Sequence, residues 1–193
     1  MCNTDAKQSK RSNVHTFSNG TNGHEVHPKR WLAIVVKMNT ERSVSQKLDK
    51  MGVENFVPIQ KEVHQWSDRK KIVDRVVIPM ILFVFVDVKM EKLLKTYSFI
   101  HKFITYPGET QSAEIPVTQI KDFRYMLNKS DSRVEISDSR LALGDRIQII
   151  SGPLKGLTGE LCDLSSGKTM VAVRLDGFGY ACTSISMNDI KSV

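Results

Sequence analysis

The stretch that decides the fold of the C-terminal third runs from Gly144 to Leu161, GDRIQIISGPLKGLTGEL. Apolar and polar residues alternate on both sides of SGPLKG, which is typical of β-strands with one buried face. The glycines and proline of SGPLKG provide the positive or fixed φ angles that tight turns need. The alternation continues in TMVAVRL and YACTSIS, which follow the turn-like segments SSGK and DGFG. About fifty residues of short strands are too few for a two-sheet sandwich, so residues 141–193 predict a small SH3-like barrel.

Residues 29–128 show a different pattern, in which strand-like and helix-like segments alternate. The expected elements are a strand from Trp31 to Lys37, a helix between Thr40 and Gly52, strands at 55–64 and 72–87, a helix after Asp87, a strand at 99–106 and a helix after Thr118. Ser, Thr and Asp favour helix starts and Gly favours helix ends. This order predicts an α+β domain of the ferredoxin-like type, an antiparallel sheet with helices on one face.

Two segments lack such periodicity. Residues 1–28 are rich in Asn, Ser, Thr, Gly, Lys and His, and predict a disordered tail. Residues 129–140 are polar with two isolated apolar residues, and predict a linker of about a dozen residues that lets the flanking domains move independently. The expected organisation is therefore a tail, an N-terminal domain, a linker and a C-terminal domain.

The net charge of +7 suggests a polyanionic partner if the charge is localised. Residues 31–128 carry 15 basic and 11 acidic residues, whereas residues 141–193 carry 5 of each. Attraction to nucleic acid therefore belongs to the first two thirds of the chain.

Membrane insertion and secretion are not expected. The longest apolar run, Val76 to Val86, is about half the roughly 20 residues that a bilayer requires, and Pro79 interrupts it. The first residues, MCNTDAKQSKRSNVHTF, lack the apolar core of a signal peptide. Three cysteines without a CxxC motif fit a reducing compartment, so we expect a cytoplasmic protein.

Catalysis, cofactors and metals are not expected either. SSGKT fails as a phosphate-binding loop because Cys162 occupies the position that requires glycine, and because the segment joins two strands. A metal site from the tail's histidines and Cys2 lacks ligand spacing. No nucleophile–base–acid spacing or carboxylate pair is present, so the sequence predicts a protein that is not an enzyme.

Several residues resemble known motifs. The KOW motif is matched by Gly144, Asp145, Gly152, Pro153, Gly156 and Gly159, and its later Phe-Gly turn by Phe178 and Gly179. Tyr180 stands where that turn usually has a basic residue. Trp31, Lys37 and the segments 78–84, 103–104 and 115–118 resemble the N-terminal domain of NusG proteins. From about residue 30 onward the chain is similar to NusG-family transcription factors, most of all to the UpxY-type antiterminators of capsular polysaccharide operons. The family's Pro-Gly-Tyr is Pro79-Met80-Ile81 here.

The resemblance implies that an apolar patch of the N-terminal domain docks on the clamp helices of RNA polymerase. The candidate residues are Val35, Ile81, Phe83, Phe103 and Tyr106. The alternative is that they are ordinary sheet core. The resemblance also implies that the KOW domain recruits a ribosomal protein or the Rho terminator through Phe178, which is otherwise a core aromatic.

Residues 61–75, KEVHQWSDRKKIVDR, are expected to bind single-stranded DNA of the non-template strand. Cations neutralise phosphates, an aromatic ring stacks on an unpaired base, and polar side chains contact base edges. The candidate residues are Lys61, His64, Gln65, Trp66, Arg69, Lys70, Lys71 and Arg75. The alternative is a solvated hairpin whose three acids dilute the patch and whose Trp66 folds back on the sheet.

These observations predict an elongation or antitermination factor that binds RNA polymerase and suppresses pausing or termination. A KOW-containing RNA-binding or ribosome-associated protein is the alternative. A basic barrel would favour that alternative, but residues 141–193 are neutral.

Overall fold

The computed structural model describes residues 28–65, 69–137, 143–163 and 169–193. The expected disordered tail lies outside these residues, apart from Pro28. The described residues contain no helix long and apolar enough to cross a membrane.

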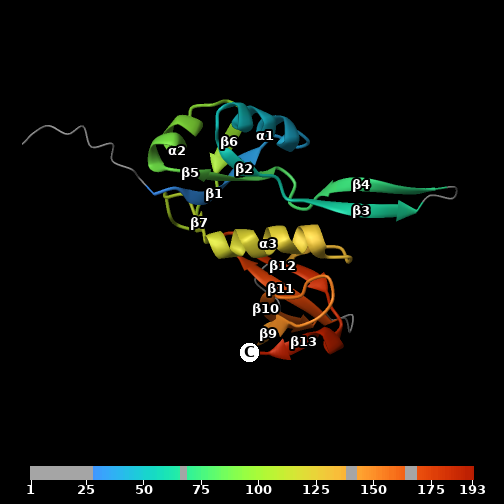
Figure 1. Ribbon diagram of the computed structural model, residues 1–193. Helices are drawn as coiled ribbons and strands as arrows, with labels where there is room; N and C mark the ends of the chain where they lie inside the picture. The colour runs from blue at the N-terminus through green and yellow to red at the C-terminus, as the bar shows by residue number, and fades with distance from the viewer. Residues whose placement is uncertain (1–27, 66–68, 138–142, 164–168) are drawn as a thin grey trace, which may run out of the picture.

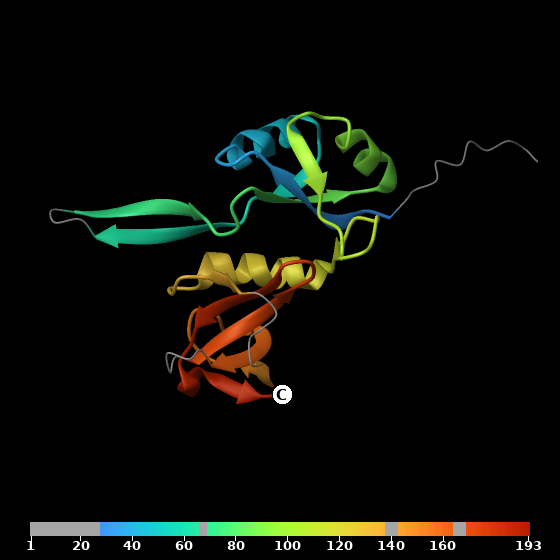
Figure 2. The ribbon, with the colours of Figure 1, turned by 180° about the vertical axis from the view of Figure 1, so that it is seen from behind.

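An antiparallel sheet forms the centre of the N-terminal part. Its order is β2 (Glu54–Phe56), β5 (Ile81–Val86), β1 (Arg30–Val36) and β6 (Ile100–Phe103), and β7 (Glu114–Ile115) also pairs with β1. Helices α1 (Glu41–Lys50) and α2 (Val88–Leu94) cover one face, and α3 (Val117–Lys129) covers the other (Figures 1 and 2). The prediction that all helices share one face is therefore wrong for α3.

The physical reason lies in β1 and β5, which are buried on both faces. Leu32 and Leu82 pack with α1 and α2, whereas Trp31 and Phe83 pack with α3. Near-continuous apolar runs such as WLAIVV are typical of strands covered on both sides.

The helix boundaries agree with the sequence at three of four predicted positions. Thr40 precedes α1, and Gly52 follows it with a φ of +71°, a conformation that glycine adopts without strain. Asp87 caps α2 by accepting a hydrogen bond from Met90 N at 2.7 Å. Helix α3 begins at Val117 with Pro116 before it, two residues earlier than predicted from Thr118.

The long strands expected at 55–64 and 72–87 are each split in two. Pro58 separates β2 from β3 (Ile59–Gln65), and Pro79-Met80 separates β4 (Lys70–Val76) from β5. Strands β3 and β4 therefore pair only with each other, as a hairpin that projects from the body of the protein (Figure 1).

The C-terminal part is a six-stranded antiparallel sheet. Its order is β13 (Ile190–Ser192), β9 (Leu143–Ile149), β10 (Thr158–Asp163), β11 (Thr169–Leu175), β12 (Gly179–Ser184) and β8 (Glu135–Ser137), and a 3-10 helix, η1 (Met187–Asp189), precedes β13. Strand β8 arises from the segment expected to be a linker. It pairs with β12, and Val134 before it is fully buried, so this part of the segment is packed on the sheet.

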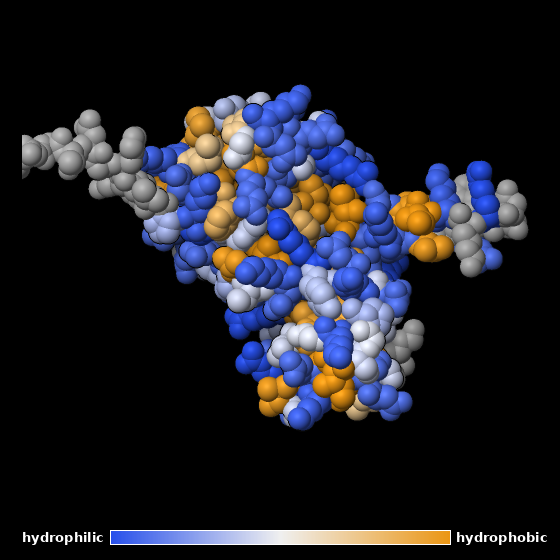
Figure 3. All heavy atoms as spheres, viewed as in Figure 1, coloured by the Kyte–Doolittle hydropathy of each residue, from blue (hydrophilic) through white to orange (hydrophobic). Residues whose placement is uncertain are grey.

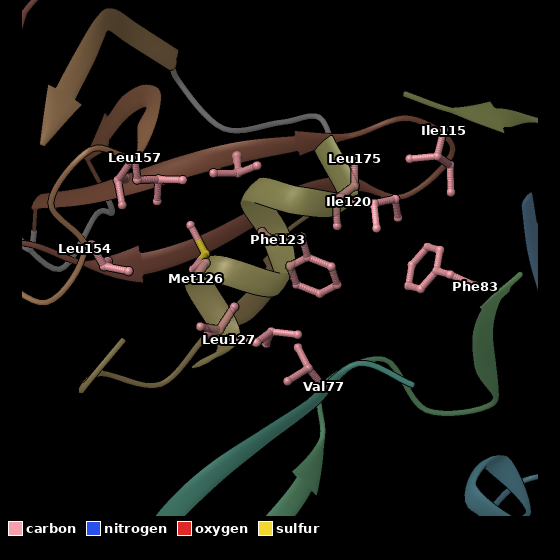
Figure 4. Close-up of a cluster of buried hydrophobic side chains, with 14 of the residues drawn as sticks. Val77, Phe83, Ile115, Ile120, Phe123, Met126, Leu127, Leu154, Leu157 and Leu175 are labelled. Carbon is pink, nitrogen blue, oxygen red and sulfur yellow. The ribbon is translucent and has the colours of Figure 1, made fainter. Parts of the chain in front are cut away.

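Helix α3 is the middle layer between the two sheets. One buried apolar cluster runs from Phe83 through Phe123 of α3 to Leu175 of β11 (Figure 4). A second cluster lies between the N-terminal sheet and helices α1 and α2. The N-terminal sheet, α3 and the C-terminal sheet therefore share a core in this conformation.

Candidate functional site

Three of the five residues expected to bind polymerase lie on one face of the N-terminal sheet. Val35 of β1 and Ile81 of β5 are paired in register, and Phe83 is two residues further along β5. Side chains two residues apart on a strand point to the same face, so all three belong to the cluster beneath α3. We call Val35, Ile81 and Phe83 the apolar face.

The apolar face is covered in this structure. Phe83 is fully buried, and its ring lies edge-on to Phe123 of α3 with ring centroids 6.2 Å apart. The ring of Phe178, from the turn between β11 and β12, also contacts Phe83, with ring centroids 5.5 Å apart and an interplanar angle of 64°. The residue expected to bind a KOW-domain partner therefore contacts a residue expected to bind polymerase.

The turn that carries Phe178 is held against the N-terminal part by further contacts. Gly177 lies so close to Ile104 and Ala113 that a Cβ at this position would be within 3.7 Å of both side chains. The amide of Asp176 donates a hydrogen bond to Oε1 of Gln119 on α3 at 2.9 Å. The turn is thus a docking element between the two parts.

Phe103 and Tyr106 lie away from the apolar face. Phe103 is buried in the cluster on the opposite face of the sheet, where the ammonium of Lys95 lies 5.3 Å from its ring centroid. Tyr106 is half-buried in the loop after β6, and its hydroxyl donates to the carbonyl of Glu114 at 3.2 Å. The structure therefore does not bring the five predicted residues into one patch.

A buried carboxylate organises this loop. Glu91 of α2 accepts hydrogen bonds from Arg30 at 2.6 Å, Lys95 at 2.7 Å and Ser112 at 2.7 Å. Burial alone would raise the pKa of Glu91, but the hydrogen bonds from Lys95 and Ser112 and the charges of Lys95 and Arg30 outweigh it and lower the pKa. The ionised carboxylate thereby ties α2 to β1 and to the loop.

The predicted nucleic-acid residues lie on the projecting hairpin. Lys61, Gln65, Arg69 and Lys71 are exposed there. His64 and Lys70 lie on the same two strands, and Trp66 is outside the described residues. The hairpin thus presents exposed cations well away from the sheet.

Arg75 differs from the other cations because it turns toward the body. Its guanidinium pairs with Glu62 across the hairpin, and it donates to the carbonyl of Val134 at 2.6 Å and to Gln60 Oε1 at 3.0 Å. Such a guanidinium has few donors left for a phosphate in this conformation.

Two features of this region were not found from the sequence. Val63 and Ile72 form a cross-strand pair that is 64% and 66% exposed, so one face of the hairpin is apolar (Figure 3).

The second feature is Arg124 of α3, which lies between Trp31 and Phe56, with its guanidinium carbon 4.8 and 4.6 Å from the two ring centroids. Burial lowers the pKa of Arg124, and the charge of Glu54 partly opposes this. The sequence could have predicted the exposed pair of Val63 and Ile72, because these residues alternate with polar residues. No sequence pattern predicts the position of Arg124.

The described residues contain no group of three or more His, Cys, Asp or Glu side chains placed to hold a metal ion. Cys162 and Cys182 are buried in the C-terminal sheet, where the thiol of Cys162 donates to the carbonyl of Met170 at 3.6 Å. Burial, with a smaller contribution from Cys162, raises the pKa of Cys182 to about 12. This thiol therefore stays protonated near neutral pH and is not an activated nucleophile.

These features define an α/β protein with two sheets, a shared helix and a projecting hairpin, whose prominent surfaces are suited to docking. Residues 29–124 match the family described as transcription termination factor nusG. The matched range includes the N-terminal sheet, the hairpin and the first two turns of α3.

The chain is also similar to a solved structure described as a domain interaction in Thermotoga maritima NusG. The sequences are 16% identical, the match covers 86% of this chain and 97% of that chain, and the TM-score is 0.46. A comparison with curated proteins gives no match.

Proposed function

We propose that this protein is a transcription elongation or antitermination factor that binds RNA polymerase in the cytoplasm and suppresses pausing or termination. The observation that carries the proposal is the family match over residues 29–124, because it includes both the apolar face and the hairpin. The resemblance to UpxY-type proteins further suggests action at particular operons, of the capsular polysaccharide type.

In this proposal the N-terminal part, residues 29–128, is a ferredoxin-like domain and residues 141–193 are a KOW barrel. The C-terminal strand order and the positive φ angles of Gly152 and Gly156, +78° and +93°, support a small curled sheet with tight turns. Residues 129–140 join the two domains and pack on the C-terminal sheet where the structure describes them.

The apolar face is the proposed contact with the polymerase clamp helices. Because Phe83 is covered by Phe178 and by Phe123 of α3, the contact requires a conformation in which the C-terminal sheet has left α3 and α3 no longer lies over this face. The same movement exposes Phe178 for a second partner, for which the family suggests a ribosomal protein or Rho. A partner that binds only the open conformation shifts the population toward it.

The hairpin is the proposed reader of the non-template DNA strand. Its projection from the body places Lys61, Arg69 and Lys71 where several cations reach one strand together. Trp66 would supply stacking on an unpaired base.

Chromosomal occupancy of the full chain, mapped beside that of RNA polymerase, tests the proposal. We expect occupancy at transcribed regions within one or a few operons. Genome-wide association with elongating polymerase would contradict the specialised role, and occupancy unrelated to polymerase would contradict the proposed function altogether.

A further inference from the structure

A buried glutamine lies where the hairpin, the C-terminal sheet and residues 130–134 meet. Residues 130–134 join α3 to β8, and we call them the connecting segment. Gln60 of β3 is 2% exposed, although it stands at the base of an otherwise exposed hairpin. Burial of an amide is costly unless its donors and acceptor find partners. The hydrogen-bond partners of Gln60 therefore indicate the structural role of its buried side chain.

The side-chain amide of Gln60 both donates a hydrogen bond to the connecting segment and accepts one from it. Its Nε2 donates to the carbonyl of Ser132 at 2.8 Å, and its Oε1 accepts from the amide of Val134 at 2.9 Å. These are the bonds that a neighbouring strand would make, so the side chain substitutes for a strand at this point. The hairpin is thereby bonded to residues 72 and 74 positions away in the sequence.

Arg75, the cross-strand neighbour of Gln60, reinforces the connection. Its guanidinium bonds to Gln60 Oε1 and to the carbonyl of Val134. Both strands of the hairpin base are therefore attached to the connecting segment.

The connecting segment is in turn attached to the C-terminal sheet. The hydroxyls of Ser130 and Thr183 are hydrogen-bonded at 2.8 Å, and Thr183, fully buried on β12, also donates to the carbonyl of Ser132 at 3.3 Å. The carbonyl of Ser132 thus accepts from both Gln60 and Thr183. A continuous chain of bonds leads from the hairpin to β12.

We propose that Gln60 is a positioning residue that couples the hairpin to the docking of the C-terminal sheet on α3. When the sheet leaves α3, the segment that holds Gln60 and Arg75 moves with β12, and the Arg75 guanidinium is released toward the hairpin surface. Only the role of the coupling rests on the proposed function. That role is to give the conformation that binds polymerase one more cation for binding nucleic acid.

Amide exchange in the full chain, resolved by residue with NMR, tests the coupling. The amide of Val134 reports the Gln60 cluster, and the amide of Asp176, bonded to Gln119, reports docking at the other end of α3. Gln60→Leu leaves buried partners unsatisfied, so we expect both amides to exchange at least about tenfold faster. Faster exchange at Val134 with Asp176 unchanged would overturn the coupling.

Two further variants complete the test. Gln148→Leu makes the same replacement at an exposed position of β9 and is expected to change neither amide. Gln60→Glu keeps the acceptor and loses the donor to Ser132, and is expected to accelerate both amides by a smaller factor. If Gln60→Leu fails to fold, Gln60→Glu decides the question by the same criterion.

Binding to single-stranded DNA at several salt concentrations separates the coupling from the proposed function. Release of Arg75 in Gln60→Leu is expected to steepen the slope of log affinity against log salt by up to about 0.7. The increase should disappear in the double variant Gln60→Leu/Arg75→Ala. Coupled exchange with an unchanged slope would contradict DNA binding through Arg75 and leave the coupling intact.

Discussion

Phe178→Ala should release the C-terminal sheet from the apolar face. Full burial of a phenylalanine contributes about 1.5–3 kcal/mol, so the half-buried Phe178 contributes about half of that. Its edge-on contact with Phe83 adds about 0.5–1.5 kcal/mol. The docked conformation should therefore lose about 2 kcal/mol, which corresponds to a roughly 30-fold change in the equilibrium between docked and open forms.

Amide exchange of Asp176 measures this change, because its hydrogen bond to Gln119 exists only in the docked form. We expect exchange to accelerate by about 30-fold, and polymerase affinity to rise by up to the same factor if the open form is rare. Phe99→Ala is the matched control. Phe99 is also half-buried, but it packs on the cluster beneath α1 and α2 and stacks on Tyr97.

Unchanged exchange at Asp176 in Phe178→Ala would refute the reasoning, since it would show that the aromatic contact does not hold the two parts together. Equal acceleration in Phe99→Ala would refute it as well, because the effect would then be a general loss of stability.

Three other outcomes are expected. Glu41 is buried and accepts the amide of Met80 at 2.8 Å, so Glu41→Ala should lower the free energy of unfolding by about 1–3 kcal/mol; an unchanged urea midpoint would contradict this. The pKa of Glu91 is lowered in the folded protein, so its contribution to stability is present above the unfolded pKa, near 4.5, and is lost as the pH falls through the folded value. As the pH falls below 4.5, the urea midpoint of unfolding should therefore decrease less steeply in Glu91→Gln than in the wild type. Equal pH dependence in the two proteins would show that the ion pairs of Glu91 do not cause the loss of stability in acid. On the hairpin, a triple neutralisation should flatten the salt dependence of single-stranded DNA binding by up to roughly 2. Arg75→Ala alone should leave it nearly unchanged, because in the docked form the guanidinium is held by the carbonyl of Val134 and by Gln60. The three neutralised residues are Arg69, Lys70 and Lys71. A slope unaffected by the triple change would mean that these cations do not contact phosphate.

Met80 shows how a departure from the family pattern is accommodated. It stands where the family has glycine, and its φ of +65° is unusual for a residue with a Cβ. Glu41 binds its amide, and its carbonyl accepts from the amide of Val36 at 2.8 Å. The sequence showed the replacement, but only the structure shows that α1 and β1 stabilise the turn.

The sequence by itself determined the local elements of this protein. Periodicity, helix caps and turn glycines are short-range properties, so Thr40, Gly52, Asp87 and four strands of the C-terminal sheet were all predictable. The cations of residues 61–75 were also correctly placed on a hairpin. A charge pattern identifies such a segment without any knowledge of its neighbours.

Only the tertiary structure decided which surfaces are free. An apolar residue such as Phe83 has the same sequence signature whether it awaits a partner or is covered by another part of its own chain, and here Phe178 and α3 cover it. Likewise Gln60 and Arg75 look like solvated hairpin residues until the segment at 130–134 is brought against them. These contacts join residues 40 to 95 positions apart. The free energy that selects them comes from burying both sheets against α3, which is a property of the assembled chain that no local pattern encodes.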